Sequence, residues 1–131
     1  MAWFRGENAM ASAHHLIASS RVEGVPVFDR QGDKLGKIDD IMIDKASGGA
    51  VYALMSFDGF LGMGERFYPI PWSLLSYDTE KDGYLVPLTR ADIEKGRSVD
   101  DREIADEIQW REALHDYYRA APYWLSPRAM L

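Results

Sequence analysis

Five aspartates lie close together in the first third of the chain and offer the carboxylate oxygens that a hard divalent cation prefers. They are Asp29, Asp33, Asp39, Asp40 and Asp44. Their spacing does not match the calcium-binding loop of an EF-hand. Acids at the turns and bulges of a solvated face explain the pattern equally well. The sequence therefore predicts no metal site here, and it leaves a divalent-cation-dependent enzyme as an alternative function.

The histidines are His14, His15 and His115, and the chain has no cysteine. A structural zinc site needs about four ligands, usually with cysteines among them, so a zinc site is not expected. The absence of cysteine also excludes thiolate catalysis and disulfides. The serines of the central region have no histidine near them in the sequence, and no nucleophile–base pair is predicted. We therefore expect no catalytic residue and no cofactor, and hence no enzyme.

A glycine-rich stretch at 59–64 carries three apolar side chains, Phe60, Leu61 and Met63. Phosphate-binding loops have similar glycines but lead into a helix, whereas the prolines at 69 and 71 keep the next segment extended. A hairpin loop is the better interpretation. Its apolar side chains either fold back onto the domain or contact a partner protein. Both alternatives remain open, and the three side chains are candidate partner-binding residues.

Residues 18–90 alternate short apolar runs with turn residues, which predicts β-structure throughout. Strands are expected at 25–28, 34–43, 51–57 and 84–88, with an extended path over 65–72 and turns at 29–33, 45–49 and 73–83. Ile38 is out of phase with Ile41 and Ile43, which predicts a β-bulge at the two aspartates between them. These short strands favour a small barrel or a sandwich, because closure removes exposed edges.

Residues 91–131 change to a helical pattern and are predicted to form a C-terminal extension. Thr89 can cap a first short helix that ends at Gly96, and Ser98 or Asp100 can begin a second. On a helical period an aromatic face follows, and an aromatic tail continues it. Its candidate partner-binding residues are Trp110, Tyr117, Tyr118 and Trp124.

This aromatic face has two interpretations. It either covers the open side of the β-domain or forms a subunit interface, where Trp and Tyr are enriched. Both hold at once if the helix exchanges between protomers of a homodimer.

The overall composition excludes several classes of partner. The net charge is −6 and no cluster of Lys and Arg occurs, so nucleic-acid binding is not expected. No apolar run is long enough to cross a bilayer. Residues 1–17 are weakly patterned, which predicts a loosely ordered segment. They lack the apolar stretch of a signal peptide, which predicts a cytoplasmic location.

The order of these signals resembles the PRC-barrel domain family. The shared features are Gly32, Leu35-Gly-Lys-Ile38 followed by acids, Gly48-Gly49 before a strand, the glycine-rich stretch, and Pro69-x-Pro-Trp72. The family is named from the H subunit of the photosynthetic reaction centre, and the chain also resembles the C-terminal half of the ribosome maturation factors. The resemblance covers residues 18–90 and brings no catalytic set with it.

The resemblance implies a mainly β protein, with a small closed antiparallel β-barrel of six strands that docks on larger assemblies. We therefore expect a non-catalytic protein-interaction or assembly module that forms a homodimer. The alternatives are a ligand-binding or accessory protein linked to photosynthetic electron transport and, as above, a cation-dependent enzyme.

Overall fold

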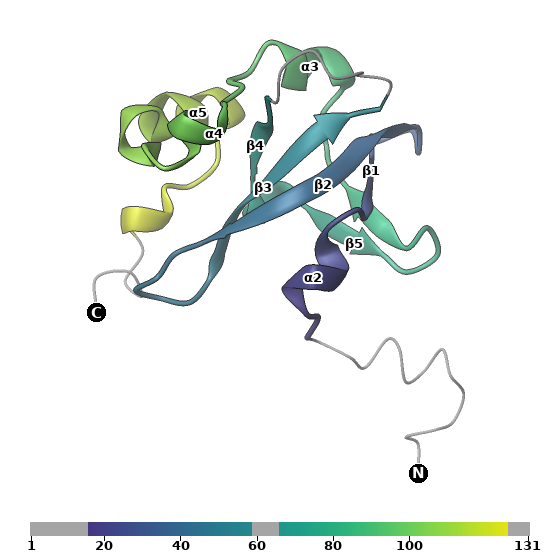
Figure 1. Ribbon diagram of the computed structural model, residues 1–131. Coiled ribbons are helices and arrows are strands. Elements are labelled where there is room, and N and C mark those ends of the chain that lie inside the picture. Colours follow the sequence, from purple (N-terminus) through teal and green to yellow (C-terminus); the bar gives the residue numbers. More distant parts are fainter. Residues whose placement is uncertain (1–15, 59–65, 126–131) are drawn as a thin grey trace.

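The computed structural model describes residues 16–58 and 66–125 (Figure 1). Within these residues six strands form one sheet, in the order β4-β3-β2-β1-β6-β5. The strands are β1 (Pro26–Phe28), β2 (Lys34–Ile43), β3 (Ala50–Phe57), β4 (Tyr68–Pro71), β5 (Ser76–Asp78) and β6 (Gly83–Leu85). The helices are α2 (Ser19–Val22), α3 (Arg90–Glu94), α4 (Asp101–Ile104) and α5 (Arg111–Tyr118), with 3-10 turns η2 (Trp72–Leu74), η3 (Glu107–Gln109) and η4 (Tyr123–Leu125).

The sheet is mixed, and the prediction of an antiparallel sheet is wrong at one pair. β1 and β6 run parallel, while the other neighbouring strands are antiparallel. In the described residues the sheet is also not closed by hydrogen bonds, since β4 and β5 stand at its two ends. Pro69 and Pro71 explain why β4 stands at the end of the sheet, because proline has no N–H to donate to a further strand. The mainly β architecture is confirmed, and barrel closure is not.

The long β2–β3 hairpin contains the predicted bulge. Its register shifts between Ile38 and Asp40, which confirms the break in the two-residue pattern. Ile38 is fully buried, whereas Ile43, near the hairpin tip, is 54% exposed. At the tip the Asp44 carboxylate accepts hydrogen bonds from the Ala46 N–H and the Ser47 hydroxyl. The bulge therefore separates a buried half of β2 from a half whose side chains reach the surface.

The segment predicted as a turn at 73–83 contains a strand instead. Ser76–Asp78 pairs with Gly83–Leu85, so that Tyr77 lies opposite Tyr84. The two rings meet edge to face with centroids 5.2 Å apart, an arrangement that stabilises cross-strand aromatic pairs. A three-residue strand is too short to show alternation, which is why the sequence pattern did not reveal it.

The C-terminal extension and the sheet share one hydrophobic core. Figure 1 shows α4 and α5 against one side of the sheet, beside β3 and β4. The extension contributes Ile93, Trp110 and Leu114, each at most 2% exposed. They belong to the same cluster as Met55 and Ile70 of the sheet. The extension is thus part of the folded unit.

Both predicted helix starts in the extension are capped by side chains. The Thr89 hydroxyl accepts from the Asp92 N–H, and the Asp92 carboxylate accepts from the Thr89 N–H. Asp100 and Glu103 form the same reciprocal pair at α4, which identifies Asp100 as the start of the second helix. Arg66 reinforces this cap, since its Nη2 lies 3.2 Å from Glu103 Oε1 and donates to the Ser98 carbonyl at 2.8 Å.

The α4 cap should make stability fall in acid. The backbone N–H of Glu103 holds the pKa of Asp100 below its ordinary value, and the backbone N–H of Asp100 does the same for Glu103. A carboxyl with a lowered pKa stabilises the fold above its unfolded-state pKa, and this contribution is lost as pH falls through the folded-state pKa. We therefore expect Asp100→Asn to destabilise the protein at neutral pH, and its difference from wild type to shrink in acid.

Urea unfolding of both proteins between about pH 7 and pH 3 measures this difference. Asp101→Asn is the matched control, because in the structure the cap bonds go to its neighbour Asp100. A deficit of Asp100→Asn that stays constant across this pH range would contradict the assignment.

Candidate functional site

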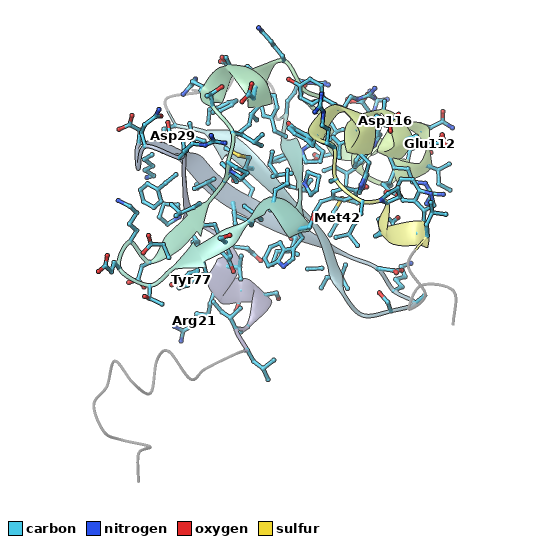
Figure 2. The ribbon with its side chains drawn as sticks, turned by 180° about the vertical axis from the view of Figure 1, so that it is seen from behind. Arg21, Asp29, Met42, Tyr77, Glu112 and Asp116 are labelled. Carbon is cyan, nitrogen blue, oxygen red and sulfur yellow. The ribbon has the colours of Figure 1, made fainter. Side chains whose placement is uncertain are left out.

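A pocket of about 300 Å³ opens where the β2–β3 hairpin meets the C-terminal extension. Figure 1 shows the tip of this hairpin beside η4. Figure 2 shows the molecule from behind, with Met42 on the hairpin near η4. We name this pocket the hairpin–extension pocket. Its lining residues are Met42, Ile43, Asp44, Lys45, Val51 and Tyr52 from the hairpin, and Glu107 and Tyr123 from η3 and η4.

Glu107 is the centre of a polar network in the wall of this pocket. Its carboxylate accepts a hydrogen bond from the Tyr52 hydroxyl at 2.6 Å and another from the Tyr123 hydroxyl at 2.9 Å. Arg111 lies further away, with Nη1 3.9 Å from Oε1 of Glu107. The Glu107 side chain is only 14% exposed, so these bonds offset much of the cost of burying its charge.

The two tyrosines keep their protons. Burial raises the pKa of Tyr52 far above its ordinary value, and the hydrogen bond to Glu107 adds to this. The pKa of Tyr123 is raised by the same two causes, burial first. Each hydroxyl therefore donates its one proton to a hydrogen bond with Glu107.

His115 lies behind Tyr52 rather than in the lining of the pocket. It is 4% exposed, with Nε2 2.9 Å from the Tyr52 hydroxyl oxygen and Nδ1 3.3 Å from the Ala120 carbonyl oxygen. The Trp124 ring packs edge-on against the imidazole, with centroids 4.9 Å apart. His115 thus connects α5 to β3 as a buried polar contact.

Glu107 and Tyr123 face the pocket as acceptors, because the carboxylate and the hydroxyl oxygen have lone pairs and no spare proton. Asp44 and Lys45 at the hairpin tip also line the pocket. Met42, Ile43 and Val51 supply its apolar lining. This arrangement can bind a group that is rich in hydrogen-bond donors and has an apolar stem.

Exposed apolar side chains adjoin the pocket. Ile43 lines it and is 54% exposed, and each of the two 3-10 turns that reach it carries another: Ile108 on η3 is 72% exposed and Leu125 on η4 is 66% exposed. We name Ile43, Ile108 and Leu125 the apolar rim. One such side chain is ordinary on a protein surface, whereas three beside one pocket are typical of a contact surface.

The predicted partner-binding residues have different positions in the fold. Phe60, Leu61 and Met63 lie outside the described residues. Trp110 and Tyr118 are 2% and 7% exposed, so for them the structure favours the interpretation in which the aromatic face covers the sheet.

The other two predicted residues are more accessible. Tyr117 is 45% exposed and donates a hydrogen bond to the Asp92 carbonyl. Trp124 is half-buried and stacks under the Arg111 guanidinium, 4.2 Å from its ring centroid.

Three aspartates of the acidic stretch, Asp29, Asp40 and Asp44, accept local hydrogen bonds at turns and at the bulge. Asp29 accepts from the N–H groups of Gln31 and Asp33, and Asp40 accepts from the N–H of Ile41. Over residues 16–58 and 66–125, no three acidic or histidine side chains come together in a group that could hold a metal ion. His14 and His15 lie outside the described residues.

The fold and the pocket together define a small mainly β domain whose sheet shares its core with a helical extension. A family model, the PRC-barrel domain, matches residues 14–93. The chain belongs to the PRC-barrel domain family, which confirms the resemblance seen in the sequence. No curated protein matches the chain. In the part of the chain that the structure describes, no helix has the length and apolar character to cross a membrane.

Proposed function

We propose that this protein is a non-catalytic interaction or assembly module, and that it docks on a partner protein through the hairpin–extension pocket and its apolar rim. The observation that carries the proposal is the exposure of Ile43, which lines the pocket, and of Ile108 and Leu125, which lie on the two 3-10 turns that contribute Glu107 and Tyr123 to it. Burying three such side chains on a partner is favourable, since each contributes in proportion to the apolar area removed from water. Membership of the PRC-barrel family supports a binding role of this kind.

The hydrogen-bond network across the pocket supports a binding role. Its two sides come from distant parts of the chain, and the Tyr52–Glu107–Tyr123 network holds them together. A preorganised surface loses little conformational entropy on binding. We also propose that the chain is not an enzyme, because Tyr52 is hydrogen-bonded to both Glu107 and His115, which leaves no free acid–base pair among the three. Homodimer formation and a cytoplasmic location stay predictions from the sequence.

Replacing two rim residues should abolish partner capture. We expect the double variant Ile43→Ser, Ile108→Ser to fold, because both side chains are more than half exposed. It should lose recovery of any assembly that the tagged wild-type protein captures from its native cell extract, as measured by quantitative mass spectrometry. Leu16→Ser is the matched control, because Leu16 is 93% exposed and precedes α2, which lies apart from α4 and α5 (Figure 1).

Two results would reject the docking surface. One is equal recovery of the same assembly by wild type and the rim variant. The other is loss of recovery with Leu16→Ser as well, which would indicate a non-specific apolar contact.

A further inference from the structure

We infer that the hairpin–extension pocket receives an arginine side chain from an apolar segment of the partner protein. This inference rests on the proposed function and specifies the chemistry of the same site. It is carried by the acceptor character of the pocket, by its apolar and aromatic walls, and by the rim beside it.

The hydrogen-bonding groups of the pocket select a donor. Tyr52 and Tyr123 each donate their proton to Glu107. The Tyr52 oxygen is further occupied by His115. What Glu107 and Tyr123 still offer are lone pairs, and a guanidinium presents five N–H donors and no acceptor. At Glu107 and Tyr123 a ligand group with acceptors alone would meet only lone pairs and would be repelled.

The walls suit the rest of an arginine side chain. Met42 and Val51 can pack along its methylene stem, as long cationic side chains do on apolar surfaces. Tyr123, which is only part-buried, lines the same pocket, and aromatic faces attract a guanidinium. The pocket volume of about 300 Å³ is at the lower limit for small-molecule sites, so it fits one side chain better than a large cofactor.

Two resident cations bear on the charge balance. The Arg111 guanidinium stacks on Trp124 and its nearest nitrogen is 3.9 Å from Glu107, which is beyond hydrogen-bond distance. This contact is an ion pair that offsets part of the Glu107 charge, and each carboxylate oxygen, which accepts one tyrosine hydroxyl, keeps a lone pair for a further donor. Lys45 is exposed and lines the pocket, so its flexible ammonium competes with an entering cation for the pocket's acceptors. Asp44 lines the pocket too, and the net charge of −6 favours the approach of a basic partner.

The apolar rim identifies the source of the arginine as a protein segment. A free small cation would fill the pocket and leave Ile43, Ile108 and Leu125 in water. An arginine flanked by apolar residues would bury both the pocket and the rim.

Peptide titration followed by two-dimensional ¹H–¹⁵N NMR tests the inference. The probe is Ac-Leu-Arg-Leu-NH2, and the neutral matched control is the same peptide with citrulline in place of arginine. We expect saturable shifts of the Ile43, Lys45 and Tyr123 amides with the arginine peptide. Citrulline should weaken the affinity by about tenfold, because a charge-assisted hydrogen bond is lost. Agmatine, a free guanidinium amine without flanking leucines, should bind more weakly than the arginine peptide.

Two substitutions should change the affinity in opposite directions. Glu107→Gln keeps an acceptor for the tyrosines and removes the charge, and should weaken the arginine peptide by about tenfold. Lys45→Gln removes the competing cation and should strengthen binding by about threefold, the size expected for a partly exposed charge. Because Lys45 is exposed, its variant should fold even if the Glu107 variant does not.

The inference is overturned if the arginine peptide gives no saturable shifts at the pocket, if citrulline binds equally well, or if agmatine binds as tightly as the peptide. These results are separable from failure of the proposed function. Rim-dependent capture together with a silent peptide titration would reject the arginine and keep the docking surface. Rim-independent capture together with peptide binding would reject the docking function and, with it, the partner as the source of the arginine.

Discussion

Gly36→Ala is expected to destabilise the protein by about 3 kcal/mol or more, beyond the range of ordinary overpacking. Gly36 lies in β2 between two partner strands, opposite Phe57 of β3 and Val27 of β1. A methyl group on its Cα would overlap the Ser56 carbonyl oxygen and would lie 2.9 Å from the Phe57 Cα. Both obstacles are backbone atoms, so a change of side-chain rotamer cannot relieve the overlap. β2 and β3 would have to move apart, and the buried core around Ile38 and Met55 would open with them.

The matched control for this substitution is Gly49→Ala at the end of the same hairpin. The added carbon would meet only the Ser47 hydroxyl oxygen at 3.5 Å, an ordinary contact. We expect a change within about 0.5 kcal/mol, as for a typical surface substitution. Urea denaturation followed by circular dichroism measures both variants. A Gly36→Ala protein as stable as Gly49→Ala would show that β2 and β3 do not approach as closely as described.

Local patterns were sufficient to predict the longest elements of this fold. β2 has the predicted bounds, because turn residues mark both of its ends and apolar side chains recur between them. The bulge followed from three isoleucines whose spacing breaks the two-residue period. The capped helix starts followed from Thr89 and Asp100, since a side-chain oxygen in the right place is a local signal.

Strand pairing and closure depend on contacts that no local pattern contains. The parallel pairing of β1 with β6 joins residues such as Val27 and Tyr84. Strands of three residues have no measurable period, so β5 could not be recognised before its partner was known. The prolines of β4 are a local signal that excludes helix. That β4 stands at the end of the sheet, where its missing donors need no partner strand, follows only from the strand order.

The candidate site could not be predicted for the same reason. Tyr52 and Glu107 are bonded across 55 positions of sequence, and Tyr52 and His115 across 63. No short motif includes them, and each residue type is common by itself. The sequence did predict surplus aromatic side chains in the extension. Only the fold separates those that are buried, such as Trp110, from those beside the pocket, such as Tyr123.

Trp110→Ala should cost about 3–5 kcal/mol, the range for truncating a large buried aromatic side chain. Trp110 is 2% exposed and packs on the Tyr52 ring with centroids 5.3 Å apart. Its indole N–H donates to the Glu103 carbonyl at 2.8 Å, so the substitution also leaves that acceptor without its partner. Trp110→Phe keeps an aromatic ring and should cost less, and Ile108→Ala on the adjoining turn, where the side chain is 72% exposed, should cost little.

The concentration dependence of this series tests where Trp110 packs. If the extension covers the sheet of its own chain, as the shared core shows, Trp110→Phe should lower the unfolding midpoint without changing how that midpoint depends on protein concentration. If the helix instead exchanges between protomers of a dimer, Trp110 contributes to association, and its substitution changes the concentration dependence through mass action. A concentration dependence that differs between Trp110→Phe and wild type would therefore assign Trp110 to a subunit interface, and Tyr52, which it contacts, would then form part of that interface rather than of a single-chain pocket.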